Sequence, residues 1–157
     1  MKQIELNSGT VRVSDPCYEP DIWCAKTVKD MLAGKFNCKA RVKDCGDWGK
    51  RIATLTIRHE DYPKGGFDEY LGSVGVDSGQ CGFFDPEYYE KNQPDDDFNN
   101  KESWYRRVCE LTLNEPDWGT IDGKGVVASS GYGDGYYSVY ACRNSSGFIV
   151  GLRLKFI

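Results

Sequence analysis

The 157-residue sequence predicts an α+β protein: a twisted, mostly antiparallel sheet of six to eight strands with two helices packed on one face. Short segments in which apolar and polar residues alternate predict the strands, because successive side chains of a strand point to opposite faces. Glycine makes up 18 of the residues and supplies turns between these segments. Two further segments carry the apolar spacing of a helix. No linker or internal repeat is visible, so we expect a single domain, residues 1–157.

The start of the chain is predicted to contain a hairpin and a helix. Residues 3–6 and 10–13 alternate, and the "NSG" between them favours a hairpin. The following "SDPCYEPD" contains two prolines, which interrupt regular structure. In residues 21–34 apolar side chains lie three and four positions apart, between a capping Asp21 and a closing Gly34. This spacing predicts a helix.

The segment 35–44 has the clearest strand pattern in the chain. Its apolar side chains, which predict the face toward the core, are Phe36, Cys38, Ala40 and Val42. Its cationic side chains, which predict a solvated face, are Lys35, Lys39, Arg41 and Lys43. Such a row can bind an anion, and we select Lys39 and Arg41 as candidate ligand-binding residues. Alternatively, the charges only protect an edge strand from aggregation.

The rest of the chain adds turns, a second helix and more strands. "SGQCG" predicts a turn, and the polar residues 90–100, with three consecutive aspartates, predict a loop. The segment 100–114 has helical apolar spacing and predicts a helix capped by Asn100. "NSSG" is expected to join the last two strands as a hairpin. The remaining predicted strands are 51–59, 70–77, 125–130, 136–143 and 147–157.

Composition narrows the classes of partner and compartment. The net charge of −4 and the pI of about 5.1 argue against general binding to duplex nucleic acid, which favours a basic surface. The N-terminal residues lack the apolar core of a signal peptide, and no apolar run reaches the length of a membrane span. We therefore expect a cytoplasmic protein that contacts no membrane and keeps its seven cysteines as thiols.

Metal and thiol chemistry find little support in the sequence. The cysteine spacings miss the short gaps of zinc sites, and the single histidine, His59, excludes a site built on two imidazoles. A thiol nucleophile would need His59 to meet a cysteine such as Cys17 in the fold. No cofactor is expected.

A glycine-rich turn in "VVASSGYGDGYYSVY" is the first candidate ligand-binding segment. Glycines permit positive φ angles and close approach of another group, and successive amides in such a turn can hold an anion. Four tyrosines beside it, Tyr132, Tyr136, Tyr137 and Tyr140, offer rings to a flat or polar ligand. The candidate residues are Gly131, Tyr132, Gly133, Asp134, Tyr136 and Tyr137. The alternative is an ordinary hairpin turn in which Asp134 bonds its own backbone.

The segment "VDSGQCGFFD" is the second candidate, with Asp77, Gly79 and Asp85. Asp77 ends a predicted strand, and Asp85 stands before a proline. If this segment meets the glycine-rich turn, Asp77, Asp85 and Asp134 form an acidic cluster suited to a hard cation or to a hydroxyl or amine donor. The alternative is three independent turn aspartates.

Together the two motifs resemble the domain of unknown function 4241 over residues 71–157. The residues that carry the resemblance are Val76, Asp77, Gly79, Phe84, Asp85, Ser129, Ser130, Gly131, Gly133, Asp134, Gly135 and Tyr137. Ser138 stands where the family usually has a proline. The resemblance implies that the two turns belong to one signature and lie close in space. It implies no reaction.

These observations favour a small non-enzymatic binding protein whose ligand is small, polar and nucleotide-like. A phage or mobile-element protein that sequesters a signalling nucleotide would combine tyrosine rings, amide-lined turns and cations in this way. One alternative is a hydrolase whose three aspartates hold a divalent cation. Another is a protein that inhibits a partner protein through its acidic surface. Binding ranks first because no complete catalytic constellation is visible.

Overall fold

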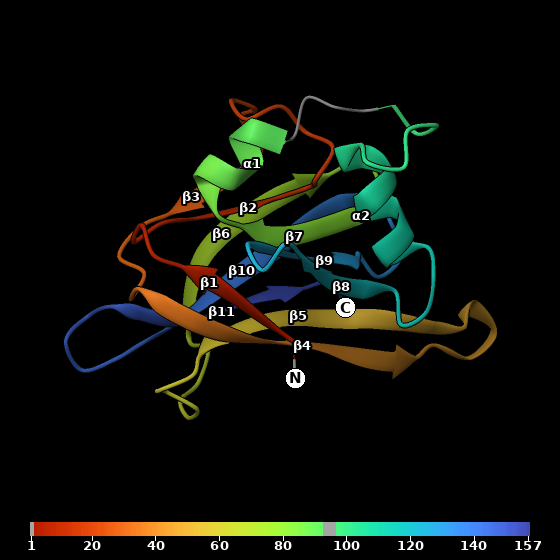
Figure 1. Ribbon diagram of the computed structural model, residues 1–157. Helices are drawn as coiled ribbons and strands as arrows, with labels where there is room; N and C mark the ends of the chain where they lie inside the picture. Colours follow the sequence, from red (N-terminus) through yellow and green to blue (C-terminus); the bar gives the residue numbers. More distant parts are fainter. Residues whose placement is uncertain (1, 93–96) are drawn as a thin grey trace.

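The computed structural model describes residues 2–92 and 97–157, which form two antiparallel sheets and two helices. The sheets pack face to face, and both helices cover the outer side of one sheet (Figure 1). The predicted α+β class and the antiparallel pairing are confirmed. The extent of the sheet is wrong, because the described residues form eleven strands in two sheets, where a single sheet of six to eight was expected.

The six-stranded sheet contains most of the strands predicted from alternation. All of its neighbouring strands are antiparallel. Their order across the sheet is β1 (Gln3–Leu6), β4 (Gly34–Asp44), β5 (Lys50–His59), β11 (Ile149–Lys155), β10 (Gly135–Arg143) and β6 (Glu69–Val76). The predicted final hairpin joins β10 to β11, where the backbone N–H of Asn144 donates to the carbonyl of Phe148 over 2.9 Å.

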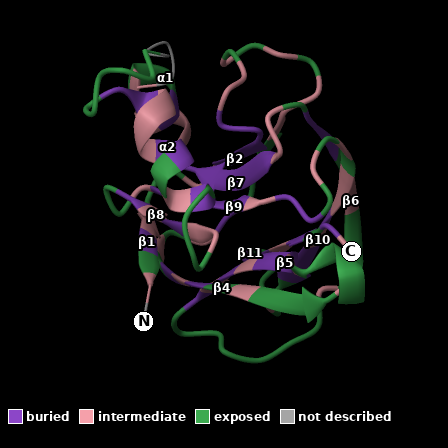
Figure 2. Ribbon diagram, turned by 90° about the vertical axis from the view of Figure 1, so that its right-hand side faces the viewer, coloured by how far each residue is buried: buried purple, intermediate pink, exposed green. Residues whose placement is uncertain are grey.

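The five-stranded sheet lies between the helices and the six-stranded sheet (Figure 2). Its order is β3 (Lys26–Val28), β2 (Val11–Ser14), β7 (Gln80–Phe84), β9 (Gly125–Ser129) and β8 (Trp118–Ile121). Every residue of β7 is buried, because one face meets the other sheet and the other face meets the helices. A strand covered on both faces shows no alternation, so the turn predicted over "SGQCG" is too long: Ser78 and Gly79 turn the chain, whereas residues 80–82 belong to β7.

Two apolar clusters hold the layers together. The main core lies between the sheets and includes fully buried side chains from both, such as Leu55 and Leu154 from one and Phe83 from the other. A second cluster, in which Phe84 and Trp104 take part, lies beneath α1 (Pro86–Asn92) and α2 (Trp104–Thr112). Burial of this aromatic surface fixes both helices on the five-stranded sheet.

The second helix forms where the sequence predicts it, but with a different cap. The side chain of Ser103 accepts a hydrogen bond from the backbone N–H of Arg106, so Ser103 caps α2 in place of the predicted Asn100. α1 was not predicted, and it occupies the start of the segment 90–100 that was expected to be a loop. The middle of that expected loop, residues 93–96, lies outside the described residues.

The hairpin predicted for 3–6 and 10–13 is wrong, although both strands exist. β1 pairs with β4 in one sheet, whereas β2 pairs with β3 and β7 in the other. All four residues of β2 are buried. A two-stranded hairpin cannot cover both faces of such a strand, so β2 lies inside the five-stranded sheet.

The helix predicted for 21–34 is also wrong. The segment contains the short strand β3, and the backbone of Asp30 has a φ of 64°, which a right-handed helix does not allow. The carbonyl of Cys24 accepts a hydrogen bond from the backbone N–H of Gly75 in β6. The segment therefore spans from the edge of one sheet to the edge of the other, and its backbone bonds to strands on both sides instead of forming a helical ladder. No helix in the described part of the chain is long and apolar enough to cross a membrane.

Replacing Leu154 by alanine tests the packing between the sheets. Leu154 is fully buried in the main core, so Leu154→Ala should lower the free energy of unfolding by about 2–5 kcal/mol. Leu113 is 72% exposed, so the matched control Leu113→Ala should change it by less than about 0.5 kcal/mol. Urea unfolding followed by circular dichroism measures both. Equal effects of the two substitutions would contradict the two-sheet core.

Candidate functional site

The structure brings the two predicted turns side by side. Gly135 pairs with Val76 in the ladder between β10 and β6. The backbone N–H of Ser130 donates to the carbonyl of Gly79 over 3.0 Å. A Cβ atom placed on Gly79 would lie 3.9 Å from the Cα of Gly133. The turn after Asp77 and the glycine-rich turn therefore form one end of the molecule.

The buried carboxylate of Asp15 organises this end. Its Oδ2 accepts hydrogen bonds from the backbone N–H groups of Asp77 (2.8 Å) and Ser78 (2.7 Å). Its Oδ1 accepts from the backbone N–H of Cys17 (2.8 Å) and from the Ser78 hydroxyl (2.7 Å). Four donors thus compensate the burial of one charge. Asp15 was not predicted as a site residue. Its sequence did carry a signal, because an aspartate often accepts a hydrogen bond from the backbone N–H two residues later and so forms a turn.

The glycine-rich turn is closed by its own side chains. The Ser130 hydroxyl donates to the carbonyl of Gly133 over 2.8 Å, and the Tyr137 hydroxyl contacts the same carbonyl over 2.6 Å. Burial raises the pKa of Tyr137, whose ring packs edge-on against Phe156. Tyr137 is therefore a structural residue of the turn, and its hydroxyl is already engaged within the protein.

The three predicted aspartates do not form one cluster. Asp77 and Asp134 are exposed at the paired turns. Asp85 lies beyond the opposite end of β7, where its Oδ1 accepts a hydrogen bond from the backbone N–H of Tyr88 in the first turn of α1 (2.9 Å). Within residues 2–92 and 97–157 no group of three or more His, Cys, Asp or Glu side chains is arranged to hold a metal ion. The expected three-aspartate cation site is not formed.

The other two tyrosines of the predicted site are exposed. The ring of Tyr132 lies edge-on to that of Trp48, with 6.5 Å between centroids, and the guanidinium of Arg51 lies 5.6 Å from the Tyr132 ring centre. Tyr136 lies beside Gly75 on β6. The two rings have different neighbours, and neither ring lines the basic surface cavity described below.

The pair of Cys17 and His59 is not assembled. The Sγ of Cys17 lies 4.0 Å from the Nε2 of Gln80, and burial raises the pKa of this thiol to about 12. His59 instead contacts the carbonyl of Ala33 through its Nε2 atom over 2.9 Å. A protonated thiol without a base nearby is a poor nucleophile.

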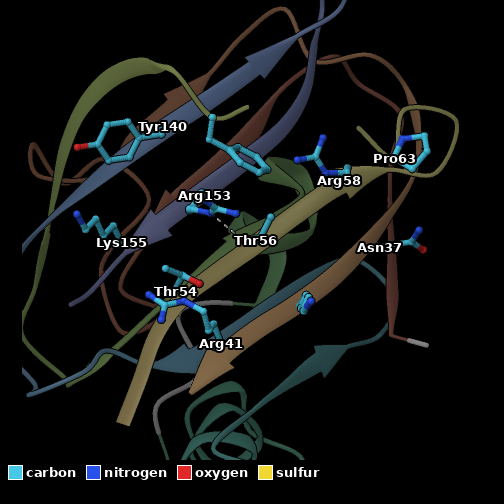
Figure 3. Close-up of a pocket in the computed structure, with 11 residues that line it drawn as sticks. Asn37, Arg41, Thr54, Thr56, Arg58, Pro63, Tyr140, Arg153 and Lys155 are labelled. Carbon is cyan, nitrogen blue, oxygen red and sulfur yellow. Dashed lines mark hydrogen bonds between the residues drawn. The ribbon is translucent and has the colours of Figure 1, made fainter. Parts of the chain in front are cut away.

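A cationic groove crosses the outer face of the six-stranded sheet, the face that no helix covers (Figure 3). Its volume is about 810 Å³. It is lined by Asn37, Lys39, Arg41, Thr54, Thr56, Arg58, Pro63, Phe67, Tyr140, Arg153 and Lys155. Five of these side chains are cationic and none is acidic. We call this surface the basic groove. It contains the predicted Lys39 and Arg41 but neither Lys35 nor Lys43.

The strand register arranges the groove in two rows. Across β4, β5 and β11 the first row is Arg41, Thr54 and Lys155, and the second is Lys39, Thr56 and Arg153. In each row a threonine separates two cations. Strand spacings of 4.7–4.9 Å put the two cations of a row about 10 Å apart at the backbone, and the rows lie about 7 Å apart along the strands.

One end of the groove is closed by the loop that connects β5 to β6. The exposed residues 60–66 run below the six-stranded sheet in Figure 2. The ring of Phe67 lies between two guanidiniums, 4.5 Å from that of Arg58 and 4.3 Å from that of Arg153. A Cβ atom on Gly151 would lie 2.9 Å from this ring, so glycine at this position makes room for it.

Two arginines of the groove are held in place by neighbouring groups. The Nη2 of Arg58 donates to the carbonyl of Gly65 over 2.8 Å, and the Nε of Arg153 donates to the Oγ1 of Thr56 over 3.3 Å. Burial lowers the pKa of Arg153, and the positive charges of Arg58 and Arg41 lower it further. Burial is the larger of these causes, and the smaller contribution of the two arginines is not offset by any carboxylate of the groove lining.

These features describe a two-sheet α+β protein with helices on one side and an open cationic groove on the other. The chain belongs to the DUF4241 family, described as "Protein of unknown function", whose match covers residues 4–154. The resemblance seen over residues 71–157 is therefore correct in its family but too short, because β1 to β5 belong to the family as well. Comparisons with curated proteins and with solved structures gave no match.

Replacing Asp15 by asparagine tests the anchor of the paired turns. The side-chain nitrogen of asparagine cannot accept a hydrogen bond. Asp15→Asn replaces one carboxylate oxygen by this nitrogen, so the donors to that oxygen lose their acceptor. We expect the free energy of unfolding to fall by about 2–4 kcal/mol. The exposed Asp134 provides the matched control, and Asp134→Asn should change stability by less than about 0.5 kcal/mol. Chemical unfolding distinguishes the two, and a stable Asp15→Asn variant would show that the turns do not depend on this carboxylate.

Proposed function

We propose that this protein binds a small, phosphate-bearing, nucleotide-like ligand in the basic groove and holds it without chemical change. The observation that carries this proposal is the presence of five cations and no carboxylate on one concave surface of a protein whose net charge is −4. Acidic side chains are more numerous than basic ones in the sequence as a whole, so their absence from the groove lining is a local feature.

The cations of the groove are available to a ligand. Within the described residues, Lys39, Arg41 and Lys155 form no ion pair, whereas the ion pairs that do occur involve other side chains. Lysine and arginine bind phosphate through charge-assisted hydrogen bonds, which are stronger than neutral ones. An anionic ligand would therefore gain attraction without first displacing an internal carboxylate.

The groove also offers rings and hydroxyls, which a nucleotide needs in addition to cations. Tyr140 lies beside Arg153 in the strand ladder, and its ring packs against that of Tyr70 with 5.6 Å between centroids. Phe67 supplies a second ring near the closed end. A base can stack on such rings, and ribose hydroxyls can bond to Asn37 or to the threonines.

The lining favours binding over catalysis. It contains no histidine, cysteine or carboxylate that could serve as a general base or nucleophile at neutral pH. A hydrolase built on Asp77, Asp85 and Asp134 has no support from their positions. Sequestration of a signalling nucleotide is the use that fits a groove with binding groups and no catalytic ones.

A double charge reversal tests the groove as the binding site. Lys39→Glu/Arg41→Glu removes one cation from each row, so affinity for AMP and ATP should fall at least about tenfold, since a hydrogen bond to a charged group contributes about 1.5–3 kcal/mol. The control Lys29→Glu/Lys101→Glu changes the net charge equally at exposed residues outside the groove and should bind as the parent does. Isothermal titration calorimetry measures both.

The same samples test whether the ligand survives. After long incubation, chromatography should recover AMP and ATP unchanged. Native mass spectrometry of protein taken directly from cells should show a bound phosphate-containing molecule that the double reversal loses. Equal weakening by the control variant, or consumption of the nucleotide, would overturn the proposal.

A further inference from the structure

The two rows of the groove divide it into two equivalent anion positions. Each row places a threonine hydroxyl between two cations, one on β4 and one on β11. We define the first position by Arg41, Thr54 and Lys155, and the second by Lys39, Thr56 and Arg153. Figure 3 shows Arg153 beside Thr56 and Arg41 beside Thr54 on the same face.

The threonines are placed to donate to an anion. Thr54 is only 8% exposed, and its hydroxyl has no hydrogen-bond partner among the described residues. A hydroxyl at the base of a cationic groove that has no protein partner can donate its hydrogen bond to a ligand. Thr56 already accepts a bond from Arg153, which leaves its own O–H free to donate.

We infer that the groove selects a ligand with two phosphate groups separated by a nucleoside, one phosphate in each row, over ligands with a single phosphate or a pyrophosphate. This inference rests on the proposed function and adds the ligand class. The rows lie about 7 Å apart, two residues along a strand. The phosphates of a pyrophosphate share an oxygen atom and are too close to occupy both rows. Phosphates joined through a nucleoside can occupy both.

The surroundings of the rows fit the remaining parts of such a ligand. Arg153 is paired in the ladder with Tyr140, and Lys155 with Ser138, so a ring borders the second row and a small side chain borders the first. Phe67 and the loop over residues 60–66 close the groove beyond the second row. This end wall stops a ligand from extending past the second row, so the two rows are the charged positions offered to its phosphates.

A series of adenine nucleotides tests the inference by calorimetry. The 5′-phosphorylated dinucleotide pApA should bind one per protein, at least about tenfold tighter than AMP, because both rows are filled at once. AMP should bind two per protein, one in each row. ADP should bind no more than a few-fold tighter than AMP. A 5′-phosphorylated adenine strand of eight nucleotides should not bind more tightly than pApA.

Single substitutions assign the rows. Arg41→Ala and Lys39→Ala should each lower the affinity for pApA at least about tenfold. Each variant should bind one AMP per protein, and the intact row should bind it with the affinity measured in the parent protein. Lys29→Ala serves as the matched control. Lys39 and Arg41 are both exposed, so the unfolding midpoints of the two variants should equal that of the parent protein.

The outcomes separate this inference from the proposed function. If AMP binds one per protein as tightly as pApA, the two-row inference falls while the groove remains a nucleotide site. If affinity keeps rising from pApA to the longer strand, phosphates bind outside the two rows and the inference also falls. If no nucleotide binds, both the inference and the proposed function are wrong.

Discussion

The antiparallel register between β4, β5 and β11 is the constraint on which the basic groove depends. It aligns Lys39 with Thr56 and Thr56 with Arg153, so that side chains far apart in the sequence share one face. The opposite face of the same strands supplies Phe36, Leu55 and Leu154 to the main core. A slip of one residue would exchange these faces, burying cations and exposing the core. Burial of the apolar face therefore fixes the positions of the cations without any contact among the cations themselves.

The asymmetry of the layers explains why a groove is open at all. Both helices lie on the five-stranded sheet, and their aromatic cluster gives that sheet two buried faces. The six-stranded sheet has only one buried face, so its other face must be solvated. The paired turns at the end of the molecule serve a different purpose. There the carboxylate of Asp15 joins the N-terminal segment to residues more than sixty positions later, which locks the two sheets together at that end.

The sequence predicted those parts of the fold that depend on local pattern. Period-two alternation located β4 and β5 and placed Lys39 and Arg41 on the solvated face. It failed for β7, whose residues are buried on both sides, and for residues 21–34, whose helical spacing gave way to hydrogen bonds with β2 and β6. The alternation of Arg153 and Lys155 was visible, but their position beside β5 follows from strand order, which a single sequence does not contain. The role of Asp15 depends on equally distant partners. Asp85 was predicted as a ligand-binding residue from its place in the second motif. In the structure its carboxylate instead accepts a hydrogen bond from the first turn of α1.

The charge of the groove and the position of its end wall come from different parts of the chain, as the contact of Phe67 with Gly151 illustrates. The charged rows belong to the hydrogen-bonded ladder, where an insertion or deletion would disturb every neighbouring strand. The end wall comes from a connection outside the ladder. It meets the sheet through the Phe67 ring, which rests against Gly151, and through Arg58, which donates to the carbonyl of Gly65. Changes in the length or composition of that connection can lengthen or shorten the cavity while the cations stay in place. The reach of the groove and its charge therefore depend on separate parts of this chain.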